Sequence, residues 1–203
     1  GHGTHVAGII AALDNDIGVV GVAPETNLYI LKALNENGKG TTSSVTAAID
    51  WAIQNKMDII NLSLATLDDD LILREIVKKA YNSNILIVAA AGNKKNATGL
   101  EENIGFPAKY EEAIAVTALN NDLTLSKTSS VGLDAELTAP GTTINSTFPM
   151  HLQSKTTTGY DYMSGTSMAA PFVSAVAALY MEKYPELPKK SIRSLLQDTA
   201  LDL

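Results

Sequence analysis

The stretch Asn84-Ile-Leu-Ile-Val-Ala-Ala-Ala-Gly-Asn93 indicates a short strand with apolar side chains on both of its faces. Such unbroken runs, rich in β-branched residues, are typical of parallel sheets that helices cover on both sides. The run ends in small residues and an amide, at the strand tip where open α/β sheets place their functional groups. Asn93 is therefore a candidate donor to an oxyanion. On this stretch alone, an ordinary turn residue after a strand is the simpler interpretation.

Further strand-like and helix-like runs alternate along the chain on either side of this stretch. The predicted strands cover residues 27–34, 57–64, 85–91, 113–119 and 137–139. The predicted helices cover residues 4–13, 43–55, 69–83, 166–183 and 189–198. Repeated βα units predict an α/β fold in three layers, with a mostly parallel, twisted sheet and helices on both of its faces. Because no repeat or linker interrupts the pattern, we expect a single domain over residues 1–203.

Polar residues indicate where two of these helices begin. Ser43 or Ser44 is a natural N-cap for the helix over 43–55. The run Asp68-Asp-Asp70 precedes the next helix and matches the positive end of its dipole. The acidic run is therefore explained by capping, without a functional role.

Composition excludes several classes of protein. A chain of 203 residues with 45% apolar content is long enough to bury a substantial core. The net charge of −7 and the lack of a basic patch argue against nucleic acid as the main partner. The absence of cysteine excludes disulfides and a thiol nucleophile. No apolar run reaches the length of a membrane span, and no signal peptide is recognisable.

The segment Tyr162-Met-Ser-Gly-Thr-Ser-Met-Ala-Ala-Pro171 places Ser167 at the start of a predicted apolar helix. The hydroxyl and backbone N–H of Ser167 would lie at the positive end of the helix dipole, where an oxyanion is stabilised. Gly165 would leave room for a substrate carbonyl, and Pro171 is expected in the first turn, where backbone N–H groups are free. A buried N-cap serine is an equally good interpretation of this segment alone.

The segment Gly1-His-Gly-Thr-His-Val-Ala-Gly8 adds a candidate general base at the head of another predicted helix. The ordinary pKa of histidine lies near neutrality, which suits a group that takes and returns a proton. Two histidines three residues apart would also suit a metal. The only other histidine is His151, and there is no cysteine, so the sequence offers too few of the usual ligands for a zinc site.

Taken together, these three segments resemble the subtilisin family of serine endopeptidases, in the order in which that family has them. The resemblance extends over the whole chain and includes framework segments at residues 18–24, 50–53, 57–64 and 139–141. It implies that Ser167 is the nucleophile and that His2, rather than His5, is the base. It also implies that the Asn93 amide and the Ser167 N–H hold the oxyanion.

The resemblance implies that a peptide substrate binds in extended conformation between two backbone segments, Gly38-Lys39-Gly40 and Ser63-Leu64-Ala65. The pocket for the residue before the cleaved bond would be walled by Ser63 to Ala65, by Ala90 to Gly92 and by the region of Ile104 and Gly105. Ala65 departs from the family, which has glycine there, so its methyl group would narrow the cleft or shift the substrate. Lys94 would lie near the pocket mouth and favour an acidic or neutral residue, whereas Glu101 and Glu102 would favour a basic one.

The segment from Leu13 to Val19 resembles the family's calcium loop. Structural calcium would be held by the main-chain carbonyls of Leu13, Ile17 and Val19 and by the Asn15 side chain. The family also implies a secreted or extracellular protein, with cell-surface attachment left open.

The family's catalytic aspartate lies upstream of the histidine, so we expect it before residue 1, with the domain truncated at both ends. The chain's own upstream segment, covalent or as a separate chain, is then an expected partner, and the chain alone is expected to be nearly inactive. A broad degradative enzyme and a processing peptidase are both open. The competing classes are a catalytically dead subtilisin-like binding domain and an esterase-like hydrolase.

Overall fold

The computed structural model describes residues 1–93, 103–152 and 158–202 of the chain. Its centre is a four-stranded sheet in the order β1 (Ile59–Leu62), β2 (Leu86–Ala90), β3 (Ala113–Leu119) and β4 (Leu137–Pro140). All three pairings are parallel, with Ile60 beside Ile87, Val88 beside Ile114 and Val116 beside Leu137. The predicted parallel sheet is therefore confirmed.

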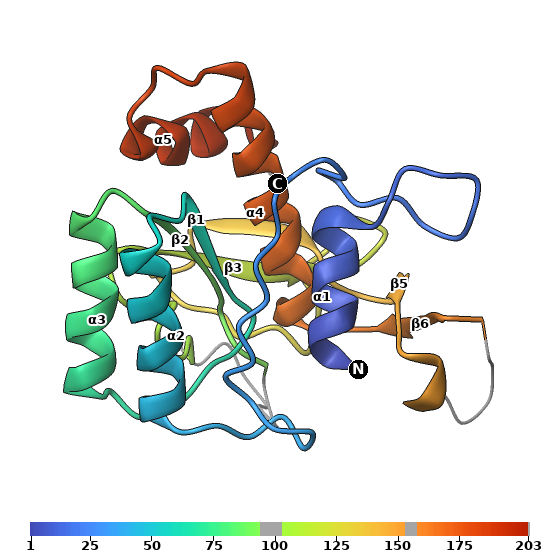
Figure 1. Cartoon of the computed structure of the whole chain (residues 1–203), viewed down its shortest axis with the longest axis horizontal. Helices are drawn as coiled ribbons and strands as arrows, with labels where there is room; N and C mark the ends of the chain where they lie inside the picture. Colours follow the sequence, from blue (N-terminus) through green and yellow to red (C-terminus); the bar gives the residue numbers. More distant parts are fainter. Residues whose placement is uncertain (94–102, 153–157, 203) are drawn as a thin grey trace.

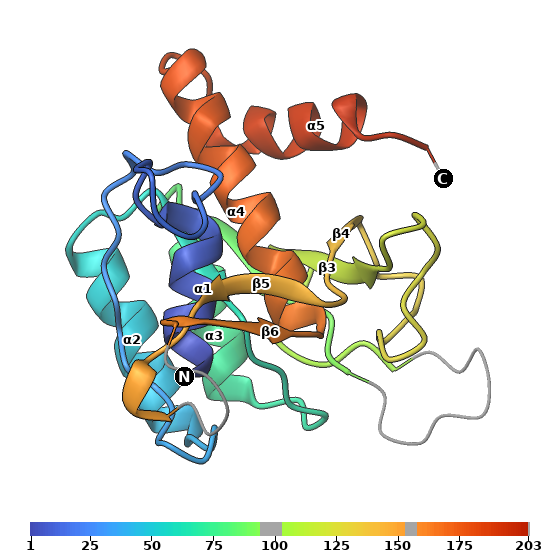
Figure 2. The same ribbon diagram turned by 90° about the vertical axis from the view of Figure 1, so that its right-hand side faces the viewer.

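Helices cover both faces of the sheet, because successive strand side chains point to opposite sides. Ile87 and Ala89 pack under α2 (Thr42–Gln54) and α3 (Leu71–Asn82). Leu86 and Val88 pack under α4 (Thr166–Lys183) and α5 (Lys189–Thr199). Figures 1 and 2 show these two helix layers on either side of the strands, so the predicted three-layer architecture is confirmed.

Two helix starts show how local sequence sets the boundaries. The helix α2 begins after Thr41, not after Ser43 or Ser44, because Thr41 and Ser44 exchange side-chain hydrogen bonds with each other's backbone N–H in a capping box. The helix α3 begins after Asp70, whose carboxylate accepts from the N–H groups of Ile72 and Leu73. The acidic run before α3 thus provides its cap, as the sequence indicated.

A third part of the molecule lies beside α4. It consists of α1 (His2–Ala11) and an antiparallel pair of strands, the hairpin of β5 (Ile144–Thr147) and β6 (Tyr160–Met163). The short 3₁₀ helix Met150–Leu152 lies between these two strands in the chain. The helix α1 packs against α4 and β5. Both views show α1 and α4 side by side, with their first turns at the same end of the molecule. The sequence did not predict the hairpin, because its strands are polar and bury little.

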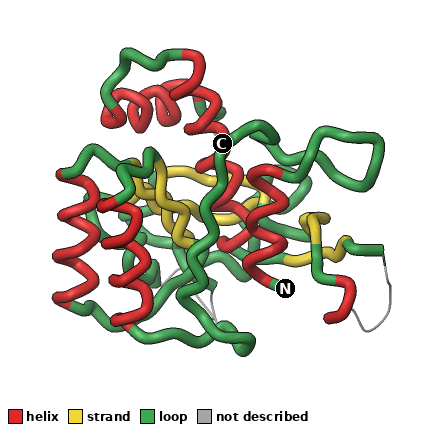
Figure 3. Tube along the Cα trace, viewed as in Figure 1, coloured by secondary structure: helices red, strands yellow, loops and turns green. Residues whose placement is uncertain are grey.

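The strand predicted over residues 27–34 is wrong: this segment forms no strand and is drawn as loop in Figure 3. Its side chains are largely exposed, with Tyr29 at 57% and Ile30 at 66%. A strand needs a neighbour to complete its hydrogen bonds, and β1 has none on its outer edge among the described residues. The apolar pattern of this segment is therefore present without the pairing that would make it a strand.

Candidate active site

The first turns of α1 and α4 bring two of the predicted catalytic residues to one end of the molecule. His2 is the first residue of α1, and Ser167 is the second residue of α4. Val6, one turn into α1, and Met168, the residue after Ser167, belong to the same buried cluster. This packing fixes the two helix starts relative to each other.

Ser167 lies beside the segment that follows β1. Its hydroxyl donates to the Ser63 carbonyl at 3.2 Å, and the Ser63 hydroxyl donates back to the Ser167 carbonyl at 2.8 Å. The second bond is possible because Pro171, four residues further along α4, has no N–H to offer the Ser167 carbonyl. Pro171 therefore lies beyond the first turn, contrary to the expectation from sequence, and Ser63 replaces the helical hydrogen bond that it removes.

The Ser63 hydroxyl is itself held by a chain of side-chain hydrogen bonds. The Asn61 side-chain Nδ2 donates to the Ser63 hydroxyl oxygen at 3.0 Å, and the Ser174 hydroxyl donates to the Asn61 side-chain Oδ1 at 2.9 Å. Ser174 lies two turns after Ser167 on the same helix. These hydrogen bonds thus connect Ser174 of α4, through Asn61 of β1, to Ser63. Ser63 in turn bonds to Ser167 at the start of α4.

Asn93 is oriented by Thr166, the neighbour of Ser167. Its side-chain oxygen accepts from the Thr166 backbone N–H at 3.0 Å and from the Thr166 hydroxyl at 3.3 Å. Because both partners are donors, the oxygen of the amide faces Thr166 and the Nδ2 group is the one that faces away. A Cβ at Gly165 would lie 3.0 Å from that Nδ2, so glycine keeps the approach to the donor open.

Thr166 is a member of the site that sequence reasoning missed. It is fully buried, and its hydroxyl also accepts from the Gly92 N–H at 3.1 Å. It therefore ties the end of the segment after β2 to the start of α4. The only sequence signal was its place in the run of small residues before Ser167, which did not distinguish Thr166 from packing residues.

His2 is half-buried at the head of α1. Burial, followed by the nearby His5, lowers the pKa of His2 below its ordinary value. The imidazole is therefore neutral at neutral pH and free to accept a proton. Within the described residues no hydrogen bond joins His2 to Ser167, whose hydroxyl points to Ser63 instead.

His5 has a different surrounding from His2. It is completely buried, and its Nε2 lies 3.0 Å from the Ile144 carbonyl and 3.1 Å from the Asp161 carbonyl, so Nε2 carries the proton. In return, the Ser146 and Thr147 hydroxyls donate to the His5 and Thr4 carbonyls of α1, each at 2.8 Å. These reciprocal bonds fasten α1 to the hairpin, which gives His5 a structural role.

The predicted substrate segments differ in how their backbone is used. No described residue makes a backbone hydrogen bond with Leu64 or Ala65, so both are free to pair with an added strand. In the segment 38–40, the Lys39 N–H and carbonyl both bond to Asn35 in a turn.

Among the residues predicted to line the pocket, Ala90 is buried under α4, whereas Gly92 and Gly105 lie beside Ala65. Lys94 lies outside the described residues, as do Glu101 and Glu102.

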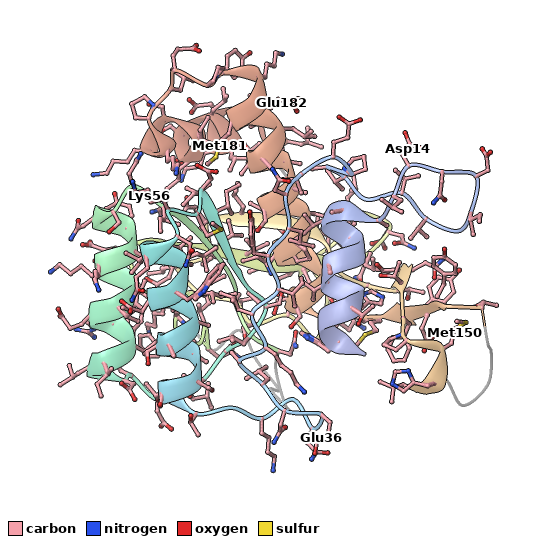
Figure 4. The ribbon with its side chains drawn as sticks, viewed as in Figure 1. Asp14, Glu36, Lys56, Met150, Met181 and Glu182 are labelled. Atoms are coloured by element: carbon pink, nitrogen blue, oxygen red, sulfur yellow. The ribbon has the colours of Figure 1, made fainter. Side chains whose placement is uncertain are left out.

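The four predicted calcium ligands line one cavity of about 310 Å³ next to α1. The Asn15 side-chain oxygen accepts from the Ile17 N–H at 3.0 Å, and Tyr160 of β6 places its hydroxyl 3.5 Å from the Ile17 carbonyl. Oxygen donors of this kind suit calcium. Figure 4 labels Asp14 in this loop and Glu36 in the turn before residues 38–40, at opposite ends of the view. The loop is thus remote from that turn.

Comparison with known proteins places the chain in a family. The profile of the subtilase family matches residues 1–203. Subtilisin DY from Bacillus licheniformis is 46% identical over 203 residues, which are the whole of this chain and 71% of that protein. Subtilisin NAT from Bacillus subtilis subsp. natto is 44% identical over 98% of this chain and 50% of its own length.

Two further similarities extend the comparison. The minor extracellular protease Epr from Bacillus subtilis (strain 168) is 42% identical over the whole chain, which spans 30% of that protein. Among solved structures, sphericase superposes with a TM-score of 0.84 at 35% identity, over 98% of this chain and 69% of that one. Sequence and fold agree, and the chain belongs to the subtilase family.

Proposed function

We propose that the protein is a serine endopeptidase in which Ser167 is the nucleophile, His2 the general base and acid, and Asn93 an oxyanion donor. Membership of the subtilase family supports serine endopeptidase activity in general. The observation that carries the residue assignment is the anchoring of the Asn93 amide on Thr166, immediately beside Ser167. It leaves a fixed N–H donor next to a hydroxyl at a helix N-terminus.

In the proposed reaction, the Ser167 Oγ attacks the carbonyl carbon of the scissile peptide bond and gives its proton to His2. The negative charge on the former carbonyl oxygen is held by the Asn93 Nδ2 and the Ser167 backbone N–H. The C–N bond then breaks, and the departing amine takes the proton from His2. Water hydrolyses the resulting ester by the same route and restores the Ser167 hydroxyl.

For this step the Ser167 hydroxyl must turn from the Ser63 carbonyl toward His2. The bond that it gives up is the one to the Ser63 carbonyl, and catalytic hydrogen bonds of this kind tighten when substrate binds. The lowered pKa of His2 supports the base role, because the neutral imidazole is the form that accepts the proton. We further propose that a carboxylate upstream of residue 1 completes the triad by orienting His2.

The same upstream segment is proposed to pair with β1. The outer edge of β1 has no partner strand among the described residues, and the apolar side chains of residues 28–31 lie exposed. An added strand would satisfy the free backbone groups of β1 and cover apolar surface. The substrate, an extended peptide, is proposed to pair with Leu64 and Ala65, whose backbone groups bond to no residue in the described part of the chain.

Two further properties are proposals of the same kind. Structural calcium, held by the carbonyl oxygens of Leu13, Ile17 and Val19 and by the Asn15 side chain, is supported by the location of these four residues around one cavity. An extracellular location is supported by the relative whose name places it outside the cell. Among residues 1–93, 103–152 and 158–202, no helix has the length and apolarity that a bilayer crossing requires.

The assignment of Ser167 is tested by labelling the full-length protein with a fluorophosphonate. We expect one phosphonylated serine, in the peptide that contains Ser167, and a loss of labelling in Ser167→Ala. Ser164→Ala is the matched control, because it removes a neighbouring hydroxyl that only accepts from the Thr143 N–H. Equal labelling of Ser167→Ala and the wild type would contradict the proposal.

A further inference from the structure

Three small residues from three segments meet next to the candidate nucleophile. Ala65 follows β1, Gly92 follows β2, and Gly105 precedes the bridge between Thr66 and Phe106. A Cβ added at Gly92 would lie 3.5 Å from the Ala65 methyl group, and one added at Gly105 would lie 3.2 Å from it. The methyl group of Ala65 therefore projects between the two glycines.

Neither glycine can be replaced by a larger residue without strain. Residue 65 is therefore the one of the three at which the side chain can differ in size. Gly92 has a φ of +102°, which side chains rarely allow. A Cβ at Gly105 would come within 2.8 Å of the Thr66 carbonyl oxygen. The two glycines keep this space free of their own side chains, and the methyl group of Ala65 occupies part of it.

The surrounding hydrogen bonds prevent the methyl group from moving away. The Thr66 N–H bonds to the Phe106 carbonyl at 2.9 Å, and the Phe106 N–H bonds to the Thr66 carbonyl at 2.8 Å. The Gly105 N–H bonds to the Ala91 carbonyl at 2.9 Å, and the Ser130 N–H bonds to the Gly92 carbonyl at 2.9 Å. All three segments are thus tied to one another within one residue of the contact.

The reaction geometry indicates which part of the substrate would enter this space. The leaving amine must face His2, which protonates it, and His2 lies on α1. The oxyanion faces Asn93, which directly follows Gly92. In the proposed reaction, the residue that contributes the attacked carbonyl would therefore lie on the side away from α1. Gly92 leads into Asn93 on that side, and Ala65 and Gly105 lie beside Gly92.

We propose that the methyl group of Ala65 restricts the residue on the acyl side of the cleaved bond to a small side chain, such as alanine. The inference rests on the proposed function and adds the class of substrate. An aromatic side chain would have to displace a methyl group that the Thr66–Phe106 bridge holds in place. Ala65 thus acts as a specificity-determining residue that touches the substrate.

The test compares two peptide substrates that differ only in alanine or phenylalanine before the cleaved bond, with the full-length protein. We expect the wild type to prefer alanine in kcat/KM. In Ala65→Gly, the ratio of phenylalanine to alanine cleavage should rise by about tenfold or more, the size of effect that one methyl group produces in a binding pocket. The ratio is independent of how much enzyme is folded, so a destabilised variant still gives an answer.

Ala135→Gly is the matched control, since it makes the same change at an exposed turn before β4 and should leave the ratio unchanged. A wild-type preference for phenylalanine, or a ratio that Ala65→Gly does not alter, would overturn this inference and leave the peptidase assignment intact. Failure of the wild type to cleave either peptide, together with no labelling of Ser167, would overturn the proposed function itself.

Discussion

The oxygen and the nitrogen of the Asn93 side-chain amide have different surroundings. Its oxygen is used by Thr166, which fixes the orientation of the group. The nitrogen lies beside Gly165 and is, in the proposed function, the donor to a substrate oxygen. An oxyanion donor is effective because it is already oriented before charge develops. Thr166 is thus the residue that makes Asn93 suitable for this role.

Asn93→Asp separates the two functions of this side chain. The carboxylate keeps an acceptor for Thr166, so the fold should be unchanged, but it replaces the donor with a negative charge. We expect kcat to fall by about 10²–10³ or more with little change in KM, which is the magnitude that the loss of such a donor has in subtilisin.

The measurement is steady-state hydrolysis of a peptide by the full-length variant, alongside its thermal unfolding. Asn120→Asp is a suitable control, because Asn120 is a surface amide whose side chain bonds to Thr124 and Thr142. An unchanged kcat in Asn93→Asp would remove Asn93 from the oxyanion hole.

Among the helices, α3 shows how one acidic residue joins two elements. The Asp70 carboxylate caps α3 and also accepts from the Thr42 hydroxyl of α2 at 2.7 Å. These hydrogen bonds, with that from Thr42 first, lower the pKa of Asp70. The two helices that cover one face of the sheet are therefore held in register at their first turns.

Asp70→Ala should lower the thermal midpoint by about 2–4 °C at neutral pH, the usual effect of losing an N-cap in a domain of this size. Because the pKa of Asp70 is lowered in the folded state, its contribution is present above the ordinary aspartate pKa. It is lost as the pH falls through the lowered pKa of the folded state. The difference between variant and wild type should therefore shrink only in strong acid.

Thermal unfolding followed by circular dichroism across this pH range measures the effect. Asp68→Ala is the control, since its side chain takes no part in capping α3. If both variants shift the midpoint equally, the capping role of Asp70 is refuted.

The comparison of elements shows what the sequence could predict. Residues 113–119 form β3 with the predicted bounds, and α4 likewise spans Thr166–Lys183 as predicted. Both have many apolar residues, so their local sequence is enough to predict the element without knowledge of its neighbours. Residues 27–34 have a similar pattern but no neighbouring strand, so the prediction failed there. The polar hairpin of β5 and β6 was missed because its stability comes from contacts with α1, such as that of His5.

The candidate site follows the same rule. The segments containing His2, Asn93 and Ser167 were recognisable, because their residue types and order are distinctive. The bonds that orient them were not, since Thr166, Asn61 and Ser174 acquire their partners only when distant segments meet. A hydroxyl in a sequence does not reveal which carbonyl or amide it will face.

For the molecule as a whole, the proposed calcium loop and the candidate active site lie at different ends of α1. His2 begins this helix, whereas the loop that starts at Leu13 follows its last residue, Ala11. Bound calcium would therefore act on stability rather than on the reaction. The loop also contacts the hairpin through Gly18, because a Cβ at this glycine would overlap the ring of Tyr160. A bound ion would thus stabilise the packing of loop and hairpin together.

Chelation of calcium should lower the thermal midpoint of the full-length protein without changing the preference between two peptide substrates. An ion present at 100 times its dissociation constant stabilises the folded state by about 2.7 kcal/mol, which corresponds to a shift of roughly 5–10 °C. Asn15→Ala should abolish the response to calcium. Asn35→Ala should keep it, because Asn35 makes a similar side-chain bond to backbone N–H groups in another loop. A thermal midpoint that is the same with calcium and with chelator would refute the proposal that the oxygen atoms of Leu13, Ile17 and Val19 bind calcium.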